Sequence, residues 1–92
     1  MTKITLRQTT SEERQQAQSW ELWESGDTDR FEYQYTEDVE FIVQEGQAVI
    51  SSEDNEPVTI APGCHVTIQE GVYGKWAISS PIVNRYRYLT NG

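Results

Sequence analysis

The only cysteine and the only histidine of this chain, Cys64 and His65, are adjacent in the segment PGCHVTIQEGVYGKW (62–76). A thiol beside an imidazole could hold a metal ion or form an activated nucleophile. A catalytic metal site, however, needs about three converging protein ligands, most often histidines. A catalytic thiol needs a cation, a helix N-terminus or a well-placed imidazole to lower its pKa. The chain offers few such groups.

The expected local structure also separates the two side chains. If 64–69 is a strand, neighbouring side chains point to opposite faces. With Val66 and Ile68 facing inward, we expect a solvent-facing or interfacial His65 and a structural Cys64. A redox-sensitive or modifiable thiol is the main alternative, and catalysis by the pair is the least favoured one. No catalytic residue and no metal ligand is assigned.

Most of the chain has the period-two pattern of strands that are buried on one face. In RFEYQYT (30–36) the aromatic residues share one face, and in VEFIVQE (39–45) apolar and polar residues alternate. Gly46 breaks that run, and KWAI (75–78) and IVNRYRYL (82–89) look like two further strands. About eight short strands at this spacing predict an all-β sandwich or barrel.

A helix is indicated in one place only. Thr10 followed by Glu13 in TSEERQQAQ (10–18) fits a capping box, and good helix formers follow. Because the segment has no apolar stripe, we expect one or two exposed turns. The polar cluster SEDNEP (52–57) has the composition of a turn.

Length and charge restrict the function classes. The 92 residues suit one domain, and the net charge of −8 disfavours nucleic acid and anionic membranes as partners. One cysteine cannot form an internal disulfide, and no run of about 20 apolar residues is present. We therefore expect a cytoplasmic protein.

The order of several weak signals resembles the small single-domain cupins, and more narrowly the group named for the ureidoglycine aminohydrolase cupin domain. These signals are Glu45-Gly46, Pro62-Gly63, Gly71 and Trp76. The resemblance implies a double-stranded β-helix, the RmlC-like jelly roll, with its site at the barrel mouth. We expect an N-terminal strand and short helix in residues 1–18 and a single cupin barrel in residues 19–92.

The resemblance also says where metal ligands would lie. Anchored on the glycines, the histidine and glutamate positions of metal-binding cupins fall on Tyr33, Tyr35, Val39 and Gly74. None of these is an ordinary ligand for zinc, iron or copper. We therefore expect no metal and no other cofactor.

The barrel interior is the remaining candidate site. Tyr33, Tyr35, Trp76 and Tyr86 are expected to line it, as an apolar wall with a few polar groups for a small organic ligand. The alternative is that these rings simply fill the core of a small barrel. Asn84 is expected to face inward. The neighbouring arginines, Arg85 and Arg87, are expected on the outer face, paired with glutamates.

Three functions are compatible with these observations. The favoured one is a metal-independent cupin that binds a small molecule. The second is a metal-dependent enzyme that acts on a small nitrogenous metabolite, as the resemblance implies. The third is a scaffold or interaction module. Cupins often dimerise through the outer sheet face, and we expect a homodimer in which Trp20, Trp23 and Val83 supply apolar contact.

Overall fold

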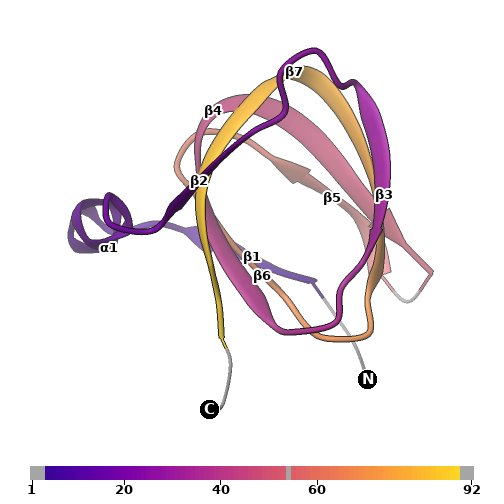
Figure 1. The fold of residues 1–92 in the computed structure, drawn as a ribbon, viewed down its shortest axis with the longest axis horizontal. Helices are drawn as coiled ribbons and strands as arrows, with labels where there is room; N and C mark the ends of the chain where they lie inside the picture. Colours follow the sequence, from indigo (N-terminus) through magenta and orange to yellow (C-terminus); the bar gives the residue numbers. More distant parts are fainter. Residues whose placement is uncertain (1–3, 54, 90–92) are drawn as a thin grey trace.

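A computed structural model describes residues 4–53 and 55–89, which form seven strands and one helix (Figure 1). All strand pairs are antiparallel, which confirms the all-β prediction. The elements are β1 (Ile4–Gln8), α1 (Ser11–Ala17), β2 (Glu21–Glu24), β3 (Arg30–Gln34), β4 (Val39–Ser52), β5 (Asn55–Ile60), β6 (Cys64–Ile68) and β7 (Tyr73–Tyr88).

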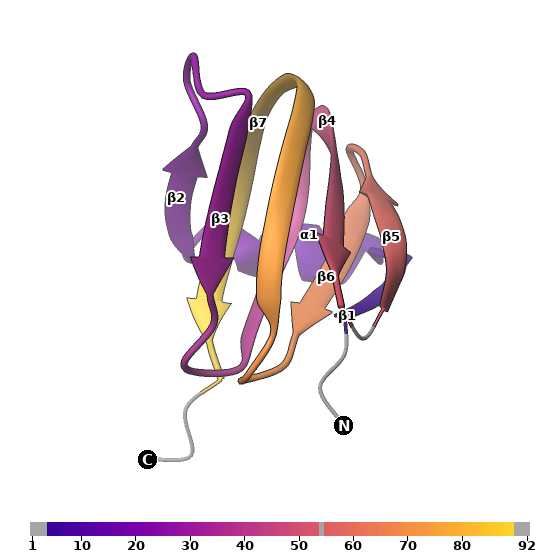
Figure 2. The same cartoon turned by 90° about the vertical axis from the view of Figure 1, so that its right-hand side faces the viewer.

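Two long strands, β4 and β7, connect the two halves of the barrel. The first part of β4 pairs with the last part of β7, and this half is extended by β6 and β1 on one side and by β2 on the other. The second part of β4 pairs with the first part of β7, and here β5 and β3 form the flanks. Seen down the shortest axis, the strands form a ring (Figure 1), and seen from the side they run next to one another (Figure 2). This arrangement confirms the double-stranded β-helix.

Gly46 allows β4 to continue from one half of the barrel into the other. Its φ is +91°, a conformation that residues with a Cβ rarely adopt. A Cβ at this position would lie 2.0 Å from the carbonyl oxygen of Pro81, where the register between β4 and β7 shifts. The expected break at Gly46 is therefore wrong. The expected separation of 75–78 from 82–89 is also wrong, because 75–78 and 82–88 belong to the single strand β7.

The segment 52–57 is only partly the expected turn. The strand β5 begins at Asn55, inside that segment, and includes Pro57. Proline cannot donate a hydrogen bond to a sheet, so within strands it is largely confined to edges and first positions. Over the described residues, β5 pairs with β4 alone, and this position tolerates Pro57.

The apolar side chains of alternate strand positions fill the barrel. Val66, Ile68, Ile50, Ile60 and Ile82 are completely shielded from solvent. Tyr35 and Trp76 belong to the same cluster and lie toward the open end. The part of the barrel that holds these aliphatic side chains is thus packed. A cavity can therefore lie only at the end that holds Tyr35 and Trp76.

The helix α1 begins as the sequence predicts but is not simply an exposed turn. The hydroxyl of Thr10 accepts from the Glu13 amide at 3.2 Å, and the Glu13 carboxylate accepts from the Thr10 amide at 3.0 Å. Ala17, at the other end, is only 1% exposed. The helix lies outside the barrel wall (Figure 1). In the described residues, no helix is long and apolar enough to cross a membrane.

Candidate ligand-binding site

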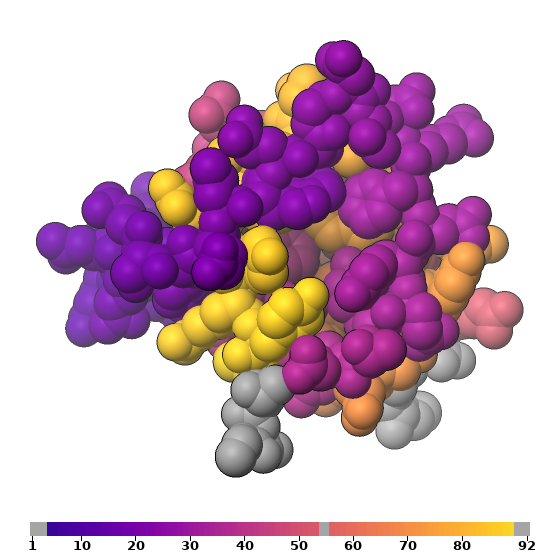
Figure 3. Space-filling view, viewed as in Figure 1, coloured from indigo at the N-terminus to yellow at the C-terminus, as the bar shows by residue number. Residues whose placement is uncertain are grey.

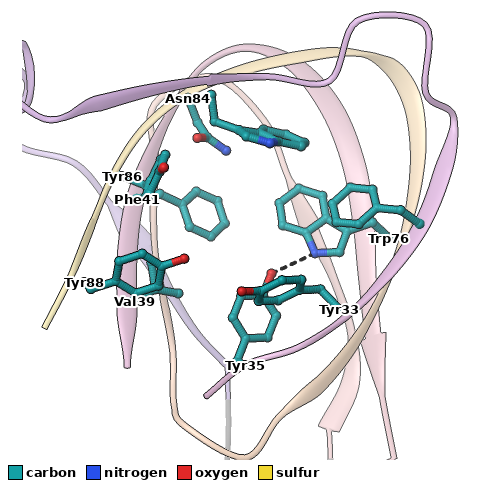
Figure 4. Close-up of a pocket in the computed structure, with 10 residues that line it drawn as sticks. Tyr33, Tyr35, Val39, Phe41, Trp76, Asn84, Tyr86 and Tyr88 are labelled. Carbon is teal, nitrogen blue, oxygen red and sulfur yellow. Dashed lines mark hydrogen bonds between the residues drawn. The ribbon is translucent and has the colours of Figure 1, made fainter. Parts of the chain in front are cut away.

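A pocket opens at the aromatic end of the barrel and has a volume of about 170 Å³. Figure 3 shows this face of the molecule hollowed between the side chains of β2, β3 and the last part of β7. In the close-up, rings surround a central space (Figure 4). The lining residues come from β2, β3, β4, β7 and the loop after β3, and they are Trp23, Phe31, Tyr33, Tyr35, Val39, Phe41, Trp76, Asn84, Tyr86 and Tyr88.

All four residues expected to line the barrel lie in this wall. They differ in depth. Tyr35 and Trp76 are 9% and 4% exposed and also belong to the core cluster, whereas Tyr33 is 43% exposed at the mouth. Tyr86 is half-buried between these extremes. The sequence left two alternatives, a ligand pocket lined by these rings or a core filled by them. The structure combines the two, because the deep rings help to fill the core and a cavity remains above them.

The pairing of β7 with both β2 and β3 positions part of the pocket wall. Trp23 on β2 lies opposite Asn84, in the last part of β7, and Phe31 on β3 lies opposite Trp76, in the first part. The loop between β2 and β3 is held to β7 by Ser25, whose hydroxyl accepts from the Ile82 amide at 2.8 Å. The sheet register therefore brings together aromatic residues that are up to 65 positions apart in the chain, since Trp23 and Tyr88 both belong to this wall.

These rings pack directly on one another. Phe31 and Trp76 are stacked, with centroids 5.1 Å apart, and Trp23 is tilted against them at 5.6 and 5.7 Å. The Phe41 ring is also tilted against Trp76, with centroids 5.7 Å apart. Contacts of this kind each add about 0.5–1.5 kcal/mol beyond the burial of area. The wall is therefore a preformed surface that needs little rearrangement to receive a ligand.

The deepest polar contact of the pocket joins Trp76 to Tyr35. The indole Nε1 donates to the Tyr35 hydroxyl at 3.1 Å (Figure 4). Burial raises the pKa of Tyr35 to about 12, and the indole hydrogen bond offsets this effect only in part. Tyr35 is consequently a neutral phenol at physiological pH.

A second pair of phenols stands at the mouth. Burial and a hydrogen bond with Tyr33 raise the pKa of Tyr88, and the charge of Glu37 contributes in the same direction. Both phenols are more than two-fifths exposed, so their hydroxyl groups can reach a ligand that enters from solvent. The contribution of Glu37 to the raised pKa of Tyr88 is smaller than those of burial and of Tyr33.

Among the residues that the structure describes, Asn84 is the one amide in the wall. Its side chain is only 3% exposed, and its Oδ1 has no hydrogen-bond partner among the described residues. A buried polar atom without a partner costs about 1–3 kcal/mol. A ligand with a hydrogen-bonding group could remove that cost, because the amide can both donate and accept at this position.

Sequence reasoning missed part of the wall. It assigned no role in ligand binding to Trp23, Phe31, Phe41 or Tyr88, although period-two alternation places Phe31 beside Tyr33 and Tyr88 beside Tyr86. The expectation that Trp23 supplies an outer dimer contact is wrong, because Trp23 faces the pocket. The inward orientation of Asn84 is confirmed.

The four positions at which metal-binding cupins carry ligands do not suit a metal ion. Tyr33 and Gly74 are direct neighbours in the β3–β7 pairing. A Cβ on Gly74 would come within 3.1 Å of Tyr35 Cε2, so the Tyr35 ring occupies space that a residue-74 side chain would need. Val39 has no donor atom at all. Among the described residues, no three His, Cys, Asp or Glu side chains are grouped to hold a metal. The side chains at these four positions therefore do not suit a divalent metal ion.

The Cys64–His65 pair lies outside the pocket. His65 faces away from the barrel interior as expected. Of the two positions predicted for it, solvent-facing or interfacial, the solvent-facing one is wrong, because His65 is only 5% exposed, and the interfacial one stays a prediction. Its cross-strand neighbour Ile42, also on the outer side, is buried too. We attribute this burial to the segment that carries α1, whose Ala17 is buried as well.

The outer face also holds a small polar cluster. Glu40 lies 3.8 Å from the His65 Nε2 and 3.2 Å from the Arg87 Nε, and Arg87 lies over the Trp20 ring at 4.5 Å. The expected pairing of an outer arginine with glutamate is confirmed for Arg87. Arg85 donates instead to the Trp20 carbonyl at 3.3 Å. Glu40 is thus a structural group of the outer face.

Comparison with known proteins identifies the domain type. The family model described as the EutQ-like cupin domain matches residues 12–86. None of the curated proteins matches the chain. The narrower likeness to the ureidoglycine aminohydrolase group is not confirmed by these comparisons.

Two solved structures share the fold. A DUF861 family protein from Thermotoga maritima is 21% identical, with a TM-score of 0.86 over 95% of this chain and 100% of its own. A putative ethanolamine utilization protein Q from Salmonella typhimurium is 19% identical, with a TM-score of 0.61 over 92% of this chain and 68% of its own. At such identities the likeness concerns the fold alone.

Proposed function

Because the chain belongs to the EutQ-like cupin domain family, we propose that it is a cupin that binds a small organic molecule without a metal. The aromatic pocket is the proposed site, with Tyr33, Tyr35, Trp76 and Tyr86 among its contacts. Cupin barrels offer a concave end, and here that end is lined by rings and a few polar groups, which is typical of small-molecule sites.

One observation carries this proposal. The pocket combines a preformed aromatic wall with a buried amide whose Oδ1 has no partner among the described residues. A core that had evolved only for packing would gain by closing the space or by replacing Asn84 with an apolar residue. A volume of about 170 Å³ lies below the roughly 300–1,000 Å³ of pockets for drug-sized molecules, so the ligand is small.

The test is a thermal-shift screen of chelator-treated protein against a library of small metabolites. A ligand that binds the native state raises the unfolding midpoint by mass action. Hits are then measured with two variants, Trp23→Leu and Trp20→Leu. Both tryptophans are half-buried, but Trp23 lines the pocket and Trp20 lies on the outer face under Arg87.

We expect hits that lose most of their midpoint shift in Trp23→Leu and keep it in Trp20→Leu. A screen with no hits, or hits that survive both substitutions, would count against the pocket as the site. Hits that need an added divalent metal would instead favour the metal-dependent enzyme considered from the sequence.

Homodimerisation and a cytoplasmic location remain predictions. With Trp23 in the pocket, the outer apolar contacts expected for a dimer reduce to Trp20 and Val83, which are both half-buried within the chain. Sedimentation velocity over a range of concentrations tests the dimer. A single species with the mass of one chain at all concentrations would contradict it.

A further inference from the structure

The chemical character of the pocket wall restricts what can bind there. Among the described residues, the wall contains no Asp, Glu, Lys, Arg or His side chain. A carboxylate or phosphate ligand would therefore find no cation to pair with and would face the negative faces of the rings. The net charge of −8 adds a further penalty for an anion.

The same features favour a cation whose charge is spread over an apolar surface. Rings of Trp, Tyr and Phe attract an ammonium group within about 6 Å of their centroids, and tryptophan does so best. The rings here come from several sides of the space, with Trp76 on one side and Tyr88 and Phe41 on the other (Figure 4). Phe31 stacks on Trp76. Such an enclosure suits a methylated ammonium group better than a primary one, because the wall has few acceptors for N–H donors.

The rim adds electrostatic support. Glu37 lies in the acidic segment between β3 and β4, and its charge acts on the phenol of Tyr88 at the mouth. A carboxylate near the mouth and an acidic chain both attract a cation to the opening. The phenol hydroxyls of Tyr33 and Tyr88 and the amide of Asn84 could bind a polar group on the rest of the ligand.

We infer that the pocket binds a small methylated ammonium compound, with the cationic head enclosed by the rings of Trp23, Trp76 and the wall tyrosines. This inference rests on the proposed function and specifies its ligand class. It requires that the positive charge itself contributes to affinity, and not only the shape of the head.

A matched pair of probes isolates that charge. Choline and 3,3-dimethylbutan-1-ol have the same shape, but the first carries a quaternary nitrogen where the second has a neutral carbon. We propose to titrate both into chelator-treated protein and to follow binding by calorimetry or by NMR. Choline is expected to bind at least about tenfold more tightly, as desolvated cation–π contacts imply. Trp23→Leu should reduce this preference, whereas Trp20→Leu should leave it unchanged.

Equal affinity for the two probes, or tighter binding of the neutral alcohol, would overturn the cation inference and leave the proposed small-molecule site intact. Failure of both probes to bind at millimolar concentration would also overturn it. The proposed function itself fails only if the wider metabolite screen returns no ligand that depends on Trp23, so the two failures can be distinguished.

Discussion

At the scale of single residues, Tyr35 has the clearest structural role in the pocket. Its hydroxyl accepts from the buried Trp76 indole, and its ring lies where a side chain on residue 74 would otherwise extend. Gly74 and Tyr35 thus form a complementary pair, in which the absence of one side chain makes room for the other. The phenol ring of Tyr35 thus packs into the space where the residue at position 74 would hold a metal ligand in metal-binding cupins.

Tyr35→Phe is expected to lower the free energy of unfolding by about 1–3 kcal/mol at pH 8, because it leaves the Trp76 indole N–H buried without an acceptor. Tyr33→Phe is the control, and at its exposed site the change should stay within about 0.5 kcal/mol. Urea denaturation measures both. A Tyr35→Phe protein as stable as wild type would contradict the assigned role of this hydroxyl.

The raised pKa of Tyr35 adds a dependence on pH. The unfolded phenol ionises near pH 10, whereas the native one stays neutral up to about 12. The unfolded state therefore binds fewer protons above pH 10, and wild-type stability falls as the pH rises through this window. Because a phenylalanine ring cannot ionise, the stability difference between wild type and Tyr35→Phe should narrow between pH 10 and 12. A difference that stays constant over this range would contradict the assignment.

At the scale of elements, the continuity of β4 and β7 determines whether the pocket exists. Each of these two strands has one part in each half of the barrel. The bend at Gly46 and Pro81 therefore keeps the aromatic side chains of both halves around one space. Without that bend, Trp76 and Asn84 could not face the same pocket from a single strand.

Gly46→Ala is expected to destabilise the protein by more than about 3 kcal/mol or to prevent folding, because the new Cβ would meet the Pro81 carbonyl. Gly63→Ala is the matched control. Gly63 also has a positive φ, +94°, but its Cβ would meet only the Arg14 side chain at 3.2 Å. Soluble yield and urea midpoints compare the two. Equal losses would mean that backbone conformation alone, and not the close approach, requires Gly46.

The strand pattern was predictable because alternation along each strand is local. Phe31, Tyr33 and Tyr35 share a face in the sequence and also in the structure. The continuity of β4 was not predictable, since glycine signals a turn and a bend equally well. Nor was the burial of His65, whose neighbour Glu40 comes from a distant strand. Local sequence patterns do not predict whether residues far away in the chain will bury an outward-facing side chain.

At the scale of the whole molecule, a charge of −8 surrounds an uncharged aromatic pocket. Four lining residues could be named from the sequence, because three of them lie on strands and Tyr35 continues the alternation of β3 into the loop that follows. Trp23 was misplaced because a short strand such as β2, with Trp23 and exposed Leu22 adjacent, does not indicate which face is buried. Whether the barrel interior is open or filled depends on how side chains of different strands pack together. Local sequence patterns do not predict that packing.

Addition of divalent metal tests the whole-molecule account of the wall. Untagged, chelator-treated protein is expected to keep its unfolding midpoint when Zn²⁺, Mn²⁺ or Ni²⁺ is added at stoichiometric amounts. The reason is that Tyr33, Tyr35, Val39 and Gly74 offer no set of ordinary ligands. A clear rise in the midpoint, with one ion retained per chain after dialysis, would contradict this expectation.

The three tryptophans provide the most direct measurement of the central claim, because Trp23 and Trp76 line the pocket and Trp20 lies outside it. In a ¹H–¹⁵N spectrum of the chelator-treated protein, the three indole N–H signals can be followed during titration with a hit from the metabolite screen. We predict that the signals of Trp23 and Trp76 shift together in a saturable way while that of Trp20 stays in place. Signals that respond only after metal is added, or a shift confined to Trp20, would contradict a metal-free binding site in the barrel.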